Sequence, residues 1–597
     1  MGWSPPSRRR LPQPTLPRTI KHPKNSPTHL ARSTRDPASR VFLLPAPRGT
    51  ASLGAVLPPR PTLLAVVLAA LCFGTSGCGR RESLVDAGTR AQILHQGIGA
   101  EPQDLDPHLL QFQSHFNVFM ALSEGLVGYD PQDLHPVPGV AERWAISPDG
   151  LTYTFHLRAN AKWSNGDPVT AHDFIFSARR ILAPKLGSPF RYYYDDVRGA
   201  KDFTASDAKD FSQVGIRALD DRTLVIELLH PMPSFLFLLG NWAWYPVHRA
   251  TLEKYGGVDR PYADWSRPGR LVGNGPFVLT EWKLGQVIVV QKNPHYWDAA
   301  RVRLNEIRFY PMENADAEER AFRAGQLHVT ENVPGSKLRD YAKRPASPLE
   351  VAPSFATYAY VFNVTRPPFA NLDVRRAFSL AIDRQSLAAS QVGSGVVPAK
   401  SFVPTVGTYA GAESANLRFD PAEAKRLLAA AGFPDGRGLP PIEIVTNTSQ
   451  LHREIAEIIQ QQWRQNLGVE VSVSLREGKV FFQERIRKQY DLARSSWFGD
   501  YPDPFAFLTL YLSDNGQNTT GYASADYDRL TWSAVKTLDV DARLARYREA
   551  EALLLRDLPV IPLFYETSRH LVHSSVRGRH PNLFDIHPYQ ALWLEQP

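Results

Sequence analysis

From about residue 91 onward, short segments of hydrophobic and polar positions follow two different periods. Residues 152–158 alternate apolar and polar side chains, which is typical of a strand with one buried face. Residues 450–467 repeat apolar side chains at helical spacing between Ser449, a favourable N-cap, and Gly468, which favours the end of a helix. The two patterns interchange without an internal repeat, so we expect an α/β protein whose chain crosses between its lobes several times.

The same reasoning predicts the other main elements. Residues 165–174 are typical of a turn followed by a helix, with Thr170 as N-cap and Asp173 completing a capping box. Further strands are expected at residues 92–94, 223–229, 442–445 and 469–475. Further helices are expected at residues 116–122, 315–330, 374–383 and 421–431.

Residues 496–508 depart from both periods. They contain two acids, two prolines, a glycine and five large aromatic side chains. Pro502 and Pro504 restrict the backbone and remove two N–H donors, which argues against a helix interior or a central strand. We therefore expect a stiff loop that holds Asp500 in a partly apolar setting, where a carboxylate is suited to bind a cation such as an ammonium group. The alternative is a turn in which Asp500 accepts hydrogen bonds from its own backbone.

Length and charge distribution limit the function classes. A chain of 597 residues is too long for one core and suggests two to four domains. The net charge is +8, but residues 1–77 hold eleven Lys and Arg residues and one acid, Asp36, so this segment carries +10 and the rest of the chain −2. Because the positive charge lies in a segment that we expect the mature protein to lack, the composition does not predict a nucleic-acid partner.

The beginning of the chain has the composition of an unfolded segment. Residues 1–60 are rich in Pro, Arg and Ser and show no apolar period, so we expect them to be disordered. Met1 is the only methionine before Met120, and a true translation start near Leu53 or Val56 would make these residues an extension that the protein does not carry.

Residues 61–77 have the organisation of a signal peptide. A positive flank precedes an apolar run at residues 63–73, and small residues follow it. The run is too short to span a membrane stably. Residues 75–78 are similar to a bacterial lipobox, which predicts that Cys78 is lipidated and becomes the first mature residue. The alternative is cleavage near Gly77 without a lipid.

Motifs of hydrolases and nucleotide-binding proteins are absent from the sequence. It contains no His-Glu-x-x-His, Gly-x-Ser-x-Gly, phosphate loop or Gly-x-Gly-x-x-Gly. The 17 histidines are scattered, and both cysteines, Cys72 and Cys78, precede the body, so a thiolate metal site or a disulfide framework is not expected there. We expect a protein without cofactor or metal that is not an enzyme; a peptide hydrolase is the alternative of a different class, and a peptidase assay would decide.

Several motifs, in their order along the chain, resemble those of the bacterial extracellular solute-binding proteins of the oligopeptide, dipeptide and nickel class, known as family 5. The resemblance covers about residues 90–595 and is carried by residues 142–144, 147–150, 152–173, 274–275, 293–297, 375–378 and 420–432. It implies a two-lobed α/β periplasmic-binding-protein fold of type II that closes about a hinge, with an extra α+β domain in the N-terminal half. The implied boundaries are 79–123, 249–352 and 566–597 for lobe I, 124–248 for the extra domain II, and 353–565 for lobe II.

The resemblance also implies a peptide-binding site. Residues 447–452 and 497–508 are most similar to the oligopeptide-binding members, in which the aspartate of a tryptophan-containing loop binds the peptide's α-ammonium group. Asp500 has that position, Trp497 would line the cleft, and the peptide carboxylate would be received by Arg485, Arg494 or His452. Without the resemblance, Arg485 would be interpreted as a solvated helix residue, His452 as a surface residue and Trp497 as a core residue.

One departure from the family pattern concerns a disulfide next to this loop. Some members carry it, whereas this chain has Phe498 and Ala356 at the two positions. The change removes no group that would bind a ligand.

The function implied by the resemblance is that of the substrate-binding component of an ABC importer for oligopeptides. Its partners would be short peptides, a permease and ATPase subunits, and the protein would be a periplasmic monomer, anchored to the membrane through lipidated Cys78. Dipeptides, murein peptides, nickel chelates or haem are alternative ligands. A peptide-sensing lipoprotein without a transport role is a further alternative.

Overall fold

The computed structural model describes residues 82–110, 113–205, 210–391 and 395–596. The predictions for residues 1–60, for the signal peptide at 61–77 and for Cys78 lie outside the described residues. None of the helices in the described ranges combines the length and the apolar content that a membrane crossing requires.

Two four-stranded sheets occupy the first half of the body. The first has the order β1-β10-β9-β8, in which only β1 and β10 are parallel; its strands are β1 (Ile93–Gly97), β8 (Phe277–Lys283), β9 (Val287–Lys292) and β10 (Glu306–Tyr310). The second is antiparallel with the order β4-β5-β7-β6; its strands are β4 (Ala141–Ile146), β5 (Thr152–Leu157), β6 (Ile216–Asp220) and β7 (Thr223–Glu227). The helices of this half are α2 (Leu84–Ala91), α3 (Gln113–Leu122), α4 (Ala171–Leu182), α5 (Ala200–Ala205), α6 (Phe235–Leu238) and α7 (Arg249–Tyr255).

A six-stranded mixed sheet organises the second half, with the order β12-β16-β11-β15-β13-β14. Its strands are β11 (Leu349–Phe362), β12 (Val397–Pro398), β13 (Ile442–Asn447), β14 (Val471–Arg476), β15 (Leu492–Phe498) and β16 (Val560–Leu571). A buried cluster of aromatic and aliphatic side chains joins it to the helices α10 (Leu372–Leu380), α11 (Arg384–Ser390), α12 (Pro421–Ala430) and α13 (Gln450–Leu467). The remaining helices are α8 (Ala315–Arg323), α9 (Gly335–Ala342), α14 (Gly478–Ile486), α15 (Phe505–Leu508), α16 (Ala525–Val535) and α17 (Val540–Asp557).

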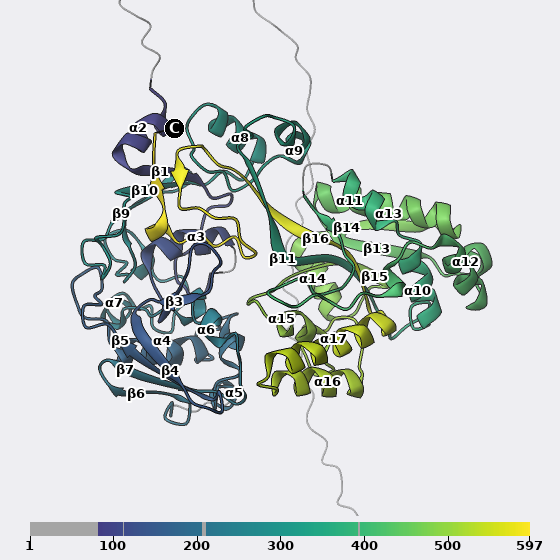
Figure 1. Cartoon of the computed structure of the whole chain (residues 1–597), viewed down its shortest axis with the longest axis horizontal. Coiled ribbons are helices and arrows are strands. Elements are labelled where there is room, and N and C mark those ends of the chain that lie inside the picture. Colours follow the sequence, from purple (N-terminus) through teal and green to yellow (C-terminus); the bar gives the residue numbers. More distant parts are fainter. Residues whose placement is uncertain (1–81, 111–112, 206–209, 392–394, 597) are drawn as a thin grey trace, which may run out of the picture. The chain divides into compact units, whose positions relative to one another are not determined.

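The strands β11 and β16 continue beyond the six-stranded sheet as a two-stranded ribbon (Figure 1). Leu349 to Pro353 pair only with β16, after an irregularity in register between Pro353 and Thr357. Beyond the end of β16, Val572 bridges to Val329, which in turn bridges to Gln96 of β1. The ribbon therefore reaches the first four-stranded sheet, and the chain passes between the two sheets at this place.

Most elements follow the pattern of the sequence. Helix α13 has the predicted bounds, with Ser449 as N-cap and Gly468 in the left-handed conformation at its end. At the start of α4 the Asp173 carboxylate accepts the backbone N–H of Thr170, as in a capping box, and it also accepts the Thr170 hydroxyl. The positions expected to hold a disulfide in some relatives, Ala356 and Phe498, are directly opposite each other in β11 and β15.

Three predictions of element bounds were wrong. The helix expected at residues 315–330 ends at Arg323, because Gly325 adopts a positive φ and reverses the chain. The helix expected at residues 374–383 ends at Leu380, because Asp383 caps a new helix, α11. The loop expected at residues 496–508 is shorter than predicted: β15 continues to Phe498 and α15 begins at Phe505.

Candidate functional site

The loop that follows β15 brings Asp500 to the end of the six-stranded sheet. Its first residue, Gly499, donates a backbone hydrogen bond of 2.8 Å to the Phe355 carbonyl. A Cβ atom at this position would overlap the rings of Phe355 and Phe507. Glycine is therefore required here. Because the backbone at Gly499 packs directly against these two rings, the path of the chain from β15 to Asp500 is fixed.

The two acids of the loop have different roles. Asp503 accepts the backbone N–H of Phe505 at 2.9 Å, which caps α15, and its carboxylate lies 3.9 Å from the Arg543 guanidinium. Asp500 accepts hydrogen bonds from two tyrosine hydroxyls, of Tyr193 and Tyr192. The sequence left open whether Asp500 accepts hydrogen bonds from its own backbone. In the structure Asp503 forms such a turn, and Asp500 instead points toward side chains from another part of the chain.

A cavity of about 390 Å³ surrounds Asp500. Its wall combines residues between 192 and 238 with residues from the end of β15 onward. The first group includes Tyr192, Tyr193, Asp195, Asp196, Lys201, Met232 and Leu238, and the second includes Trp497, Tyr501, Phe505, Leu510 and Trp532. Part of the Asp500 surface is open to this cavity, although protein atoms surround the carboxylate closely. Burial raises the pKa of Asp500 to about 6, against the hydrogen bonds from Tyr193 and Tyr192, which lower it. An ionised Asp500 is thus held where a cationic partner would stabilise it.

Trp497 lies between this cavity and a neighbouring one of about 290 Å³, which Arg485 lines. Trp497 lines both cavities, and its indole N–H donates to the Ala506 carbonyl at 2.7 Å, so the ring is fixed. Arg485, from α14, lines the second cavity and donates weakly to the hydroxyls of Ser495 (3.3 Å) and Thr519 (3.4 Å). Burial lowers the pKa of Arg485, and no described acid forms an ion pair with it. Arg485 is half-buried between these hydroxyls and is therefore less solvated than its helical pattern alone suggests.

Arg494 and His452 meet at the ring of Tyr358. The Arg494 guanidinium carbon lies 5.0 Å from the ring centroid, and the ring nitrogen Nδ1 of His452 lies 3.2 Å from the Tyr358 hydroxyl. Arg494 also donates to the Ser496 hydroxyl at 2.6 Å and forms no ion pair with a described acid. Burial, and next the charge of Arg494, lower the pKa of His452 to about 4. His452 is therefore neutral near pH 7 and would offer a hydrogen bond, not a positive charge.

The backbone of β15 is unpaired along part of one edge. On one side, β15 pairs with β11 from Leu492 to Phe498. On the other side, β13 pairs only with Leu492 and Ala493. Within the described residues, no strand pairs with that edge from Arg494 to Phe498, which leads directly to Asp500. An extended segment of another molecule could add to the sheet at this edge.

The structure brings together groups that sequence reasoning missed. Tyr192 and Tyr193 face Asp500 from more than 300 residues earlier in the chain. The aromatic run at residues 190–194 was the available signal, but no spacing argument links it to residue 500. A larger cavity of about 830 Å³ lies beside Phe498, on the side of β15 opposite Trp497, and includes Arg569.

Three comparisons identify proteins with the same organisation. The family model described as bacterial extracellular solute-binding proteins, family 5, matches residues 135–519. The periplasmic oligopeptide-binding protein OppA of Salmonella typhimurium is 35% identical over 495 residues, which cover 82% of this chain and 89% of that protein.

Solved structures agree over a similar length. The Escherichia coli murein tripeptide binding protein MppA superposes with a TM-score of 0.74 at 33% identity, covering 85% of this chain and 99% of that one. Haemophilus influenzae OppA, solved in complex with the peptide RPPGFSPFR, gives a TM-score of 0.72 at 30% identity, with 85% and 99% covered. The fold is the two-lobed α/β fold of type II that the sequence predicted. This chain belongs to the bacterial extracellular solute-binding proteins of family 5.

Proposed function

We propose that this protein is the substrate-binding component of an ABC importer for oligopeptides, and that it holds the α-ammonium group of the peptide at Asp500. The relatives are named as oligopeptide-binding and murein peptide-binding proteins. They are solute-binding proteins and not enzymes. The importer partners, a permease and ATPase subunits, supply the membrane passage and the energy that a binding protein lacks.

The observation that carries this proposal is the unpaired edge of β15 next to Asp500. A peptide that adds to the edge from Arg494 to Phe498 gains main-chain hydrogen bonds that are independent of its side chains. Its amino end then lies toward Asp500, whose charge a cation would stabilise. Binding of the constant parts of a peptide is what a receptor for many sequences needs.

The basic residues fit the other end of such a peptide. An extended chain advances about 3.3 Å per residue, so carboxylates of peptides of different length lie at different distances from Asp500. Arg485 and Arg494 are two cations without an acidic partner among the described residues, and neutral His452 contacts the same tyrosine, Tyr358, as Arg494. We infer that Arg485 and Arg494 receive carboxylates at different depths, that His452 adds a hydrogen bond, and that Trp497 forms a wall for the first side chains.

The remaining parts of the proposal concern location and organisation. We propose a periplasmic monomer anchored through lipidated Cys78, after removal of the signal peptide at residues 61–77. The domain boundaries remain 79–123, 249–352 and 566–597 for lobe I, 124–248 for domain II and 353–565 for lobe II. This division is supported by the three large sheets, since β4 to β7 all lie within 124–248 and β13 to β15 within 353–565. Mass spectrometry of the mature N-terminus tests the anchor.

Calorimetry with tetraalanine and its N-acetylated form tests the peptide proposal directly. We expect the free peptide to bind and the acetylated peptide to bind about 100-fold more weakly or worse, because acetylation removes the charge that would pair with Asp500. C-terminally amidated tetraalanine keeps the ammonium group and lacks the carboxylate, so it should lose only the part of the affinity that Arg485 and Arg494 contribute. Equal affinity of the free and acetylated peptides, or no binding of either, would refute the proposal.

Peptide affinity is expected to depend on pH in a way that reflects the protonation of the Asp500 carboxyl. The pKa of Asp500 is raised to about 6 by burial, and an ammonium group bound to it would lower that pKa, so binding releases a proton near pH 6. Affinity should fall up to about tenfold per pH unit as the pH decreases below 6. It should also fall above about pH 8, where the peptide amine loses its proton. Calorimetry between pH 4.5 and 9 in buffers of different ionisation enthalpy measures both effects, and an unchanged affinity from pH 7 to 5 would contradict the assignment.

A further inference from the structure

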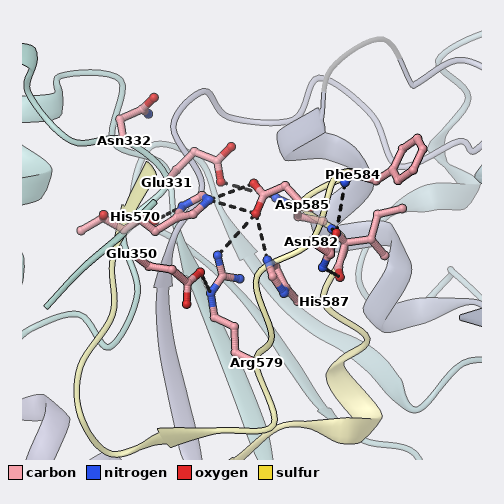
Figure 2. Close-up of polar contacts among 12 residues, drawn as sticks. Glu331, Asn332, Glu350, His570, Arg579, Asn582, Phe584, Asp585 and His587 are labelled. Atoms are coloured by element: carbon pink, nitrogen blue, oxygen red, sulfur yellow. Dashed lines mark hydrogen bonds and ion pairs between the residues drawn. The ribbon is translucent and has the colours of Figure 1, made fainter. Parts of the chain in front are cut away.

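The ribbon of β11 and β16 carries a buried cluster of charged groups at the point where the chain passes between the sheets (Figure 2). His570 lies at the end of β16, opposite Glu350 of β11. The segment 329–332 approaches from the side of the first sheet, and the C-terminal segment 579–587 lies across both. Three stretches of chain that connect the halves of the body therefore meet at one set of side chains.

His570 joins two of these stretches through both nitrogens of its ring. Nδ1 lies 2.8 Å from the carbonyl oxygen of Thr330, and Nε2 lies 2.9 Å from Oδ2 of Asp585. Both neighbours are acceptors, since a carbonyl has no proton and the pKa of Asp585 is held below its usual range by its surroundings, chiefly the charge of His570 against the opposing effect of burial. Both ring nitrogens can donate only when the ring carries two protons. The geometry therefore requires an imidazolium in a side chain that is only 6% exposed.

The surrounding charges favour that proton. Burial alone would lower the pKa of His570, but the charge and hydrogen bond of Asp585 outweigh it, and the pKa is raised above its ordinary value. Asp585 also faces His587 at 2.8 Å and Arg579 at 3.4 Å. Arg579 has its own partner, because its Nε lies 3.0 Å from Glu350.

The other titratable groups of the cluster do not compete for this role. Burial lowers the pKa of His587 to about 4, so this ring is neutral at and above neutral pH. Glu331 lines the same interior, and burial raises the pKa of its carboxyl. Its backbone N–H is held by Glu318 of α8 at 2.6 Å, which fixes the segment 329–332 from the opposite side. Burial also raises the pKa of Glu318 to about 7, so this carboxyl titrates near neutral pH as well. His570 differs from it because its ring lies between two acceptors, Thr330 and Asp585, and joins them only while it is protonated.

The cluster also borders the 830 Å³ cavity beside Phe498. Glu331, His570 and Asp585 contribute to the wall of the 830 Å³ cavity. The same wall includes Phe498 at the end of β15. A change in the packing of the cluster therefore reaches the cavity without an intervening layer of protein.

We propose that His570 is a proton-dependent brace of the hinge: when protonated it ties the segment 329–332 to the C-terminal segment across the ribbon, and loss of its proton as the pH rises loosens the hinge. The neutral ring can donate to Thr330 or to Asp585, but not to both. Because the pKa in the folded protein is raised, the stabilisation is complete below the ordinary value of about 6.5 and is lost as the pH rises through the folded value. The brace goes beyond the proposed function, and it does not depend on which solute the protein binds.

Energy transfer between dyes on the two halves tests the brace without any ligand. Leu284 and Phe419 are exposed, and cysteines at these positions can be labelled in protein whose Cys72 and Cys78 are replaced by serine. We expect the distribution of distances between the dyes to broaden as the pH rises, with a midpoint that equals the pKa of His570 measured by NMR, above 6.5. The His570→Arg variant, a permanent cation with donors on several sides, should keep the narrow distribution throughout.

The His570→Gln variant should give the broad distribution at every pH, and His135→Gln, at an exposed His–Asp pair, should behave as the wild type. If His570→Gln does not fold, the comparison of wild type with His570→Arg decides. A wild-type distribution that stays constant through the NMR midpoint would overturn the proposal. The same broadening in His570→Arg, or a His570 ring that is already neutral at pH 6, would also overturn it.

Discussion

Replacing Asp500 with asparagine is expected to weaken the binding of unblocked tri- and tetrapeptides by about 100-fold or more, because it removes one partner of a buried charge pair. Asparagine keeps the size of the side chain and can still accept a hydrogen bond from Tyr193. The loss should therefore come from the charge and not from a cavity. Asp500→Ala should weaken binding to a similar extent, and N-acetylated peptides should lose little in either variant because they carry no ammonium group.

The same substitution should stabilise the unliganded protein. The pKa of Asp500 is raised to about 6, so the folded protein binds a proton that the unfolded chain releases, and the ionised group destabilises the fold as the pH rises from about 4 to above 6. Asp500→Asn should gain about 1–3 kcal/mol at pH 7.5 and nothing near pH 4. Thermal unfolding at both pH values measures this difference. A variant that binds free peptides as the wild type does, or that is less stable at pH 7.5, would show that Asp500 has no ligand-directed role.

Arg180→Met is expected to cost about 3–5 kcal/mol of stability, the largest effect we expect from a residue outside the binding site. Arg180 of α4 donates to both carboxylate oxygens of Asp106, at 2.9 and 2.6 Å, and both side chains are 1% exposed. Burial would raise the pKa of Asp106, but the charge and hydrogen bonds of Arg180 lower it below the ordinary value. Arg180 also donates to the carbonyls of Gly257 and Val258, at 2.9 and 3.0 Å. Methionine would leave Asp106 as an unpaired buried charge.

Calorimetric unfolding measures this loss, and two further variants separate its causes. Arg529→Met is the matched control, since Arg529 pairs with Asp526 at 3.0 Å on the surface and should contribute less than about 1 kcal/mol. The double variant Asp106→Asn with Arg180→Met should recover part of the loss, because no charge is stranded. A cost below about 1 kcal/mol for Arg180→Met would mean that water reaches Asp106 and that the pair is not buried in solution.

The local elements of this fold are readable from the chain because their signals are local. A capping residue and a terminating glycine define α13, and the capping box at Thr170 begins α4. The loop after β15 was shorter than predicted, because its prolines exclude a strand or helix only at their own positions, and Phe505 starts a helix directly after Pro504. Asp500 was identified from the loop's composition and from the family resemblance, before its surroundings were known.

The sequence by itself determined the fold class, the family and the identity of Asp500 as the acid proposed to bind a peptide's ammonium group. These features depend on apolar periods, helix caps and motifs, which are all formed by residues close together in the chain. Only the tertiary structure decided that Tyr192 and Tyr193 face Asp500, that Arg485 is half-buried, that His452 is uncharged near neutral pH, and that one edge of β15 is unpaired. It also assembled His570, Thr330 and Asp585 into one cluster. The physical reason is that solvation and electrostatic partners depend on side chains that are distant in the chain. The local pattern of apolar and polar residues does not show which distant side chains will come into contact.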